Sequence, residues 1–239
     1  WSLEEIPADV LIVTCGVDVQ DDRIEVSFIG HGREDTFVLG HSVVWGSPGN
    51  DSTWTEVDDL LKSTWKHPNG GTLRVDAAVV DSGDGGFTDR VYSFTRPRFG
   101  RKIVSGKGVA GNRPAITRSS LKGTPMFLIG VDGLKAQILT RLARGRTIRF
   151  SQSLEPVYYE QVASERRVVH YVRGQPFRRF ERIPGKRAEA LDCLVYGLAA
   201  RQLVTANLDR REAELASVTA LAPHLPAVVR SKWMSGTQK

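Results

Sequence analysis

The sequence predicts an α/β fold built on a mixed β-sheet. Three strand patterns separated by short polar turns follow one another near the N-terminus, which indicates an antiparallel meander. A further apolar strand pattern comes later, followed by a glycine-rich turn and several helix patterns, which favours parallel pairing. We therefore expect the meander and the later parallel strands to share one sheet flanked by helices.

The meander is expected at residues 10–19, 23–30 and 36–45. In the first of these strands, apolar residues such as Val17 alternate with residues such as Gly16 and Asp18. Successive side chains of a strand point to opposite faces of the sheet. Asp18 is therefore expected on the face opposite Val17.

The middle of the chain is expected to combine helices with one strand and a loop. A helix capped by Ser52 or Thr53 is predicted to run to about Lys66 on the strength of its apolar stripe. An apolar strand at 74–81 ends in a carboxylate, and a helix is predicted at 88–94. Residues 105–123 are rich in glycine, serine and basic residues and show little periodicity, so we expect a mobile basic loop there.

The last part of the chain is expected to return to the sheet and then to end in helices. A strand at 125–131 precedes a helix at 133–143, which Asp132 would cap. The remaining expected elements are a short helix at 155–163, a hairpin at 166–173 and 177–183, a long helix at 186–204 and a helical segment at 209–217. We expect residues 1–204 to form one domain and residues 205–239 to form a tail that docks a partner.

Charge is distributed unevenly along the chain, although the net charge is only +6. Residues 1–89 contain 17 acidic and 5 basic residues, whereas residues 90–239 contain 10 acidic and 28 basic residues. Nine basic residues and no acidic residue lie between Arg90 and Val131. A bias of this size indicates a surface that binds a polyanion, and nucleic acid is the leading class of partner.

The composition disfavours several other classes of protein. No apolar stretch approaches the roughly 20 residues that span a bilayer, and the N-terminus lacks a signal-peptide pattern, so we expect a cytosolic protein without a membrane partner. Cys15 and Cys193 lack the spacing of a zinc site or a disulfide framework. The segment around Lys107 lacks the spacing of a phosphate-binding loop, so no ATPase site is predicted here. Because the chain begins at Trp1, we expect a fragment of a longer protein.

Three carboxylates stand where burial makes an isolated charge costly. Asp18 lies in an apolar strand, Asp81 ends another strand and Asp192 lies within an apolar helix pattern. An ionised carboxylate buried alone costs several kcal/mol unless a cation or another partner offsets it. Carboxylate oxygens are the ligands that Mg²⁺ and Mn²⁺ prefer, and two such ions together can catalyse phosphodiester hydrolysis.

Each of these carboxylates taken alone is more often a helix cap or a surface group. Their order along the chain strengthens the hypothesis of a metal site, because one lies in the first strand, one ends a later strand and one lies in a late helix. This order resembles that of the ribonuclease H-like nucleases. Glu189, three residues before Asp192 and on an adjacent helix face, is the reserve metal ligand.

Several motifs together resemble the nuclease part of lambda-type (GpA family) phage terminase large subunits. The likeness covers roughly residues 5–203, and its first and last blocks are the most specific. The matching segments are IPADV at 6–10, GVDVQDDRIE at 16–25, VDSG at 80–83 with Val91 and Tyr92, GVD at 130–132 with Lys135, EQ at 160–161, ER at 165–166, and EALDC at 189–193 with Tyr196, Ala199 and Ala200.

The resemblance implies a ribonuclease H-like endonuclease that cuts double-stranded concatemeric viral DNA during DNA packaging in the host cytoplasm. It implies that Asp18, Asp81 and Asp192 hold two Mg²⁺ or Mn²⁺ ions for two-metal phosphodiester hydrolysis. Members of the family also carry an ATPase domain in the same full-length protein and interact with a terminase small subunit and a portal protein. The segment from Arg187 to Glu189 departs from the family pattern, which tends to have Asn before this Glu.

Basic side chains are expected to grip the DNA phosphates that flank the cut. The candidates are Lys107, Arg113, Arg118, Lys135, Arg178, Arg179 and Arg182. Contacts of this kind position DNA without reading its sequence. Two rival hypotheses stay open: a nuclease of the resolvase or recombinase type with the same fold, and a catalytically silent module that binds DNA or docks on a portal.

Overall fold

The computed structural model describes residues 1, 6–83, 85–119, 126–145, 147–172 and 174–220 of the 239 residues. The strands are β1 (Ile12–Val19), β2 (Arg23–His31), β3 (Thr36–Trp45), β4 (Thr64–Lys66), β5 (Thr72–Asp81), β6 (Ile103–Val109), β7 (Ile116–Arg118), β8 (Met126–Gly130), β9 (Ile148–Phe150), β10 (Glu165–Val172) and β11 (Gln175–Arg182). The helices are α1 (Asp51–Leu60), α2 (Thr88–Thr95), the 3-10 helix η1 (Arg96–Arg101), α3 (Val131–Ala143), α4 (Pro156–Val162), α5 (Glu189–Arg201) and α6 (Leu208–Ala220).

The described strands form one nine-stranded sheet and a separate β10-β11 hairpin. The order in the large sheet is β7-β8-β6-β5-β1-β2-β3-β9, with β4 paired to β5 outside this path. β1, β2 and β3 pair antiparallel, whereas β1 with β5, β5 with β6 and β6 with β8 pair parallel. The predicted mixed sheet, an antiparallel meander joined to parallel strands, is confirmed.

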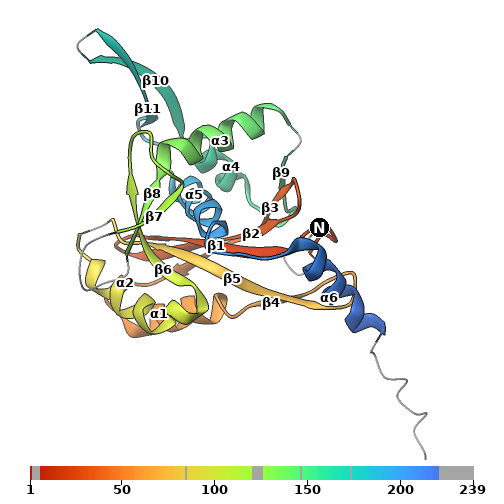
Figure 1. Ribbon diagram of the computed structural model, residues 1–239. Coiled ribbons are helices and arrows are strands. Elements are labelled where there is room, and N and C mark those ends of the chain that lie inside the picture. The colour runs from red at the N-terminus through yellow and green to blue at the C-terminus, as the bar shows by residue number, and fades with distance from the viewer. Residues whose placement is uncertain (2–5, 84, 120–125, 146, 173, 221–239) are drawn as a thin grey trace, which may run out of the picture.

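Two apolar cores lie on opposite faces of the large sheet. Val13 and Val17 of β1 pack in one core with side chains of α1 and α2. Ile12 and Ile29 pack in the other core with side chains of α3, α4 and α5. Figure 1 shows these two groups of helices on opposite sides of the sheet. Because side chains alternate along β1, Asp18 belongs to the α5 side, as the alternation predicted.

α5 is the central helix of this second layer. The sheet lies against one side of α5, and α3 and α4 contact the other. Nearly all of its residues are buried, which explains why its sequence is apolar around the whole helix. α5 is shorter at both ends than the predicted helix at 186–204.

The first helix is shorter than expected. α1 ends at Leu60, and Thr64–Lys66 forms β4, which pairs antiparallel with β5. The buried Trp65 lies opposite Leu73 in this pairing and packs against Phe28, with 5.4 Å between the ring centroids. A sheet contact therefore buries this tryptophan, and helical spacing alone does not distinguish the two possibilities.

The expected mobile loop at 105–123 is wrong over much of its length. Residues 105–109 belong to β6, which lies between β5 and β8, and residues 116–118 form β7 at the sheet edge. Gly106 allows β6 to pack closely against its neighbours, because a Cβ at this position would lie 2.5 Å from Val79 Cγ1. Residues 120–123 lie outside the described residues.

The cap predicted for α3 and the C-terminal tail differ in how the structure bears on them. Asp132 does not cap α3, since the N-cap residue is Gly130 and the Asp132 carboxylate accepts a hydrogen bond from the Gly111 N–H at 2.7 Å. Residues 221–239 of the expected docking tail lie outside the described residues. No helix in the described ranges combines the length and apolar character needed to cross a membrane.

Candidate active site

Asp18 and Asp81 lie at the same end of two neighbouring strands. β1 and β5 run parallel with Val17 beside Val80, so Asp18 and Asp81 are the next residues in register. Residues in register on adjacent strands point to the same face of a sheet. Both carboxylates therefore lie at the carboxyl ends of parallel strands on the α5 face.

Glycine allows α5 to lie directly on β1 at this point. A Cβ on Gly16 would lie 1.8 Å from the Cys193 carbonyl oxygen and 2.6 Å from the Gly197 nitrogen, so only glycine fits. Asp192 precedes Cys193 and is carried by this contact toward the end of β1 that bears Asp18. The β1-α5 crossing thus supplies the third carboxylate.

The three predicted carboxylates are coupled electrostatically. Burial raises the pKa of Asp18 well above its usual range, and the negative charges of Asp192 and Asp81 raise it further. Burial also raises the pKa of Asp81, and Asp192 adds to that shift. A bound cation would offset both the burial and the mutual repulsion of such a cluster.

Neutral donors hold two of these carboxylates. Gln20 Nε2 donates to Asp18 Oδ2 at 2.6 Å. Tyr196 Oη donates to Asp81 Oδ1 at 2.7 Å, and the Gly83 N–H donates to the same oxygen at 3.0 Å. Tyr196 lies one helical turn beyond Asp192, so α5 supplies one carboxylate and positions another. Sequence reasoning singled out neither Gln20 nor Tyr196 as a site residue.

Asp192, in contrast, lies beside two cations. Its Oδ1 is 3.2 Å from Lys135 Nζ, and its Oδ2 is 3.5 Å from Arg182 Nη2. Lys135 is only 8% exposed, and its ammonium also donates to both oxygens of Glu165 at 2.9 Å. Burial alone would lower the pKa of Lys135, but the Asp192 and Glu165 charges raise it. We expected Lys135 to contact DNA phosphates, and the structure buries its side chain beside Asp192.

Glu189, the reserve ligand, belongs to a neighbouring ion-pair network. Its Oε1 accepts hydrogen bonds from Arg23 Nη2 at 2.8 Å and from Arg187 Nε at 3.1 Å. The same two guanidinium groups contact Glu25, which is 1% exposed. The Oε1 atom of Glu189 is therefore engaged by protein cations, whereas its buried Oε2 has no hydrogen-bond partner among the described residues.

Glu25 is a residue at this site that sequence reasoning missed. It lies directly across from Asp18 in the antiparallel register of β1 and β2, and its charge contributes to the raised pKa of Asp18. Although burial opposes the shift, hydrogen bonds from His41 and Arg23 lower the pKa of Glu25 itself. The tight turn between the two strands determines this register, so counting outward from the turn identifies the pair.

The β10-β11 hairpin separates the predicted basic residues onto two faces. It extends away from the large sheet next to α3 (Figure 1). One face of the hairpin begins next to Asp192, which Arg182 contacts, and it also carries Arg167, Val169, Arg178 and Tyr171. Arg179 lies on the opposite face, where its guanidinium contacts Glu181 at 2.7 Å.

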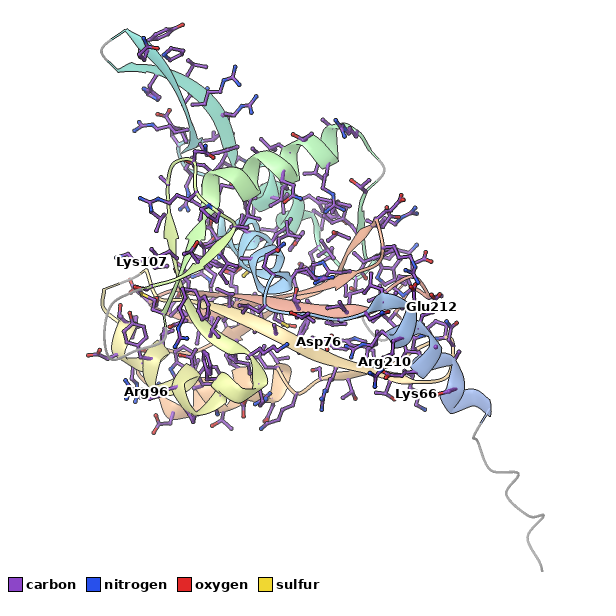
Figure 2. All side chains as sticks on the ribbon, in the orientation of Figure 1. Lys66, Asp76, Arg96, Lys107, Arg210 and Glu212 are labelled. Atoms are coloured by element: carbon purple, nitrogen blue, oxygen red, sulfur yellow. The ribbon has the colours of Figure 1, made fainter. Side chains whose placement is uncertain are left out.

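The other predicted basic residues lie on the β6-β7 side of the sheet. Lys107, Arg113 and Arg118 are all exposed. Lys107 follows Gly106, the partner of Asp81 in the sheet, so its side chain points to the face opposite the carboxylates. Figure 2 shows Lys107 at one end of the large sheet, with Glu212 toward the other end.

The site matches a hard divalent cation in donor type and charge. Asp18, Asp81 and Asp192 offer only oxygen atoms, which suit Mg²⁺ or Mn²⁺. Within the part of the chain that the structure describes, no three His, Cys, Asp or Glu side chains form a ready metal-binding cluster.

Comparisons with known proteins identify the family to which the chain is related. Residues 1–213 match the family described as terminase large subunit gpA, endonuclease domain. The chain is 26% identical over 214 residues to the terminase large subunit of Enterobacteria phage P21, covering 82% of this chain and 33% of the relative. It is 24% identical over 231 residues to the terminase large subunit of Escherichia phage lambda, covering 90% of this chain and 35% of the relative.

The chain thus spans about a third of the length of these curated relatives. Two solved structures are also similar. The large terminase of a thermophilic bacteriophage has a TM-score of 0.47 and 10% identity, covering 80% of this chain and 40% of that chain. The human cytomegalovirus terminase nuclease domain has a TM-score of 0.42 and 15% identity, covering 84% of this chain and 87% of that chain. Because the family match extends over residues 1–213, the chain belongs to the family of terminase large subunit gpA endonuclease domains.

Proposed function

We propose that the chain is a metal-dependent endonuclease that cuts double-stranded concatemeric viral DNA during phage DNA packaging. The observation that carries this proposal is that Asp18 and Asp81 lie at the same end of β1 and β5, and that the close crossing of β1 and α5 brings Asp192 to that end. Burial and the charges of Asp81 and Asp192 raise the pKa of Asp18 there. An apolar core has no need of three neighbouring negative charges, which cost free energy unless cations offset them. Family membership adds the DNA substrate to this argument.

Asp18, Asp81 and Asp192 are the residues that would hold two Mg²⁺ or Mn²⁺ ions. Asp18 would contribute to holding both ions, because the negative charges of both other carboxylates act on it and raise its pKa. When bound, the ions supply charge that stabilises the reacting phosphate and activates the attacking water. The chain itself orients the ligands, through Gln20 at Asp18 and through Tyr196 at Asp81.

DNA would approach along the hairpin face that starts at Asp192. Arg182 lies at the site, and Arg167 and Arg178 are exposed farther out on the same face. A two-stranded ribbon fits the major groove of duplex DNA, and arginine side chains on it reach the phosphates. Exposed Arg113 and Arg118 would extend the contact on the β7 side.

The wider partners follow from the family and are part of the proposal. We expect an ATPase domain in the full-length protein, a terminase small subunit, a portal protein and action in the host cytoplasm. The docking tail expected at 205–239 stays part of the proposal. Within it, Leu215 of α6 packs in the core and Arg211 contacts Asp76.

Plasmid nicking with Mg²⁺ or Mn²⁺ tests the proposed activity. We expect the parent to nick and Asp81→Asn to lose at least about 100-fold in rate, which corresponds to about 2.7 kcal/mol. Asp59→Asn is the matched control, because Asp59 is exposed on α1, on the other face of the sheet. Equal rates for the parent and Asp81→Asn would remove Asp81 from the mechanism.

The same assay separates the rival hypotheses. DNA binding without nicking by the parent, in either metal, would favour a catalytically silent module. Faster cleavage of four-way junctions than of linear duplex would favour a resolvase.

DNA binding at increasing salt tests the hairpin face. Replacing both Arg167 and Arg178 by alanine should lower the slope of log K against log salt by about 2, because each phosphate contact contributes about one. Arg179→Ala is the matched control on the opposite face and should leave the slope almost unchanged. Equal effects of the two sets would contradict the proposed DNA path.

A further inference from the structure

Positive charge within the site is concentrated at one carboxylate. Both oxygens of Asp192 face a protein cation, Lys135 at 3.2 Å and Arg182 at 3.5 Å. Over the described ranges, neither Asp18 nor Asp81 forms an ion pair with a lysine or arginine; their partners are neutral donors. The Asp192 side of the site is therefore already supplied with cations by the chain.

Lys135 is built into this position from two sides. Its stem rises from α3, and its ammonium lies between Asp192 of α5 and Glu165, the first residue of β10. The side chains of Lys135 and Glu165 are only 10% and 8% exposed. Burying an ammonium to this extent is tolerated only when carboxylates pair with it. Glu165 binds it with both oxygens at 2.9 Å, so the lysine is shared between two acids.

We propose that Lys135 is a resident counter-cation that competes with divalent metal for Asp192, and that Glu165 limits this competition by holding the ammonium. The inference rests on the proposed metal-dependent function. An ammonium and a divalent ion on one carboxylate repel each other, so metal binding must shift Lys135 toward Glu165. Without metal, the positive charge of Lys135 offsets part of the negative charge of the carboxylates. For the same reason, Lys135 raises the concentration of metal that is needed to fill the site.

The sign of the effect distinguishes competition from simple positioning. If Lys135 competes, its removal makes the site more negative and tightens metal binding. If Lys135 only orients Asp192, its removal loosens the ligand and weakens metal binding. Neutralising Glu165 acts in the reverse direction, because the ammonium is then left to Asp192 alone.

Manganese binding, followed by the loss of the free Mn²⁺ signal in electron paramagnetic resonance, measures this directly. We expect Lys135→Met to lower the apparent Kd for Mn²⁺ about tenfold, which corresponds to about 1.4 kcal/mol. Glu165→Gln should raise the same Kd several-fold. Lys66→Met is the matched control, because the exposed Lys66 lies in β4, away from the site, and its Kd should equal that of the parent.

The outcomes separate this inference from the function on which it rests. A parent that binds no Mn²⁺ would overturn the proposed metal-dependent activity. A parent that binds Mn²⁺ while Lys135→Met binds it equally or more weakly would overturn the competition alone. Circular dichroism checks the fold of each variant. If Lys135→Met does not fold, Glu165→Gln decides, and an unchanged or lower Kd refutes the proposal.

Discussion

Replacing Gly16 by alanine should damage both the stability and the active site of this domain. Gly16 is the point where β1 touches α5, and its added methyl group would meet helix backbone, not a side chain that can turn away. The obstacles are the Cys193 carbonyl oxygen at 1.8 Å and the Gly197 nitrogen at 2.6 Å. The substitution therefore requires α5 to move away from the sheet.

The size of the effect follows from these distances. Ordinary contact begins at 3.4 Å and the Cys193 oxygen would lie at 1.8 Å, so the helix must move away by about 1.6 Å, more than interdigitated side chains absorb. Overpacking typically costs about 1–3 kcal/mol, and a backbone obstacle places this case at about 3 kcal/mol. For a domain of this size, that corresponds to a fall in Tm of roughly 6–12 °C. Asp192 and Tyr196 move with α5, so nicking should fall further than the loss of folded protein explains.

Urea unfolding at neutral pH measures the change in the free energy of unfolding. Gly100→Ala is the control, because a Cβ on Gly100 meets nothing within 4 Å. It should change stability by no more than about 0.5 kcal/mol. If the free energy of unfolding of Gly16→Ala is within about 0.5 kcal/mol of that of the parent, the close crossing of β1 and α5 does not determine the geometry of the site.

Three further predictions concern the protonation of His31, the support of Asp81 by Tyr196 and the ion-pair network around Asp58. Burial lowers the pKa of His31 to about 3 from 6.5. Between these two pKa values only the unfolded chain binds the proton, so the stabilising contribution is fully present above pH 6.5 and falls by about 1.4 kcal/mol per pH unit below it. Urea unfolding at about pH 7.5 and 5.5 measures this change in the free energy of unfolding. The same pH dependence in His31→Asn would contradict the assignment. Tyr196→Phe removes the hydrogen bond to Asp81. The nicking rate should fall about 5- to 30-fold, while Tm changes by only a few degrees. An unchanged nicking rate would show that Asp81 does not depend on this hydrogen bond. Asp58→Ala deprives two arginine guanidinium groups of their carboxylate, so thermal unfolding should show a loss of about 1–2 kcal/mol in stability. The same change at the exposed Asp59 should cost less than about 0.5 kcal/mol. Equal losses for the two variants would refute the ion-pair network.

Local sequence patterns were sufficient for most of the sheet and for the carboxylates. Period-two alternation in 12–19 placed Asp18 on the face opposite Val17, as the two cores confirm. The meander strands β2 and β3 and the later strand β5 were predicted nearly to their ends. A strand can be recognised from a short stretch of sequence, because its successive side chains point to opposite faces of the sheet and so alternate in burial.

Patterns failed where one residue type serves two physical purposes. The glycines of 105–109 read as loop signals, but a strand at the centre of a sheet also requires glycine where neighbouring side chains come close. Trp65 has the spacing of a helix stripe, yet β4 buries it against the sheet. The distinction depends on atoms far away in the sequence.

By itself, the sequence determined a mixed α/β sheet, the family resemblance and three acidic residues that no apolar core requires. Only the tertiary structure decided what surrounds them, namely that Lys135 is buried between Glu165 and Asp192 and that Arg179 faces away from the site. The physical reason is that the charge environment of a side chain is set by packing. Elements separated by many residues in the chain, such as α3, β10 and α5, meet only once the sheet has formed.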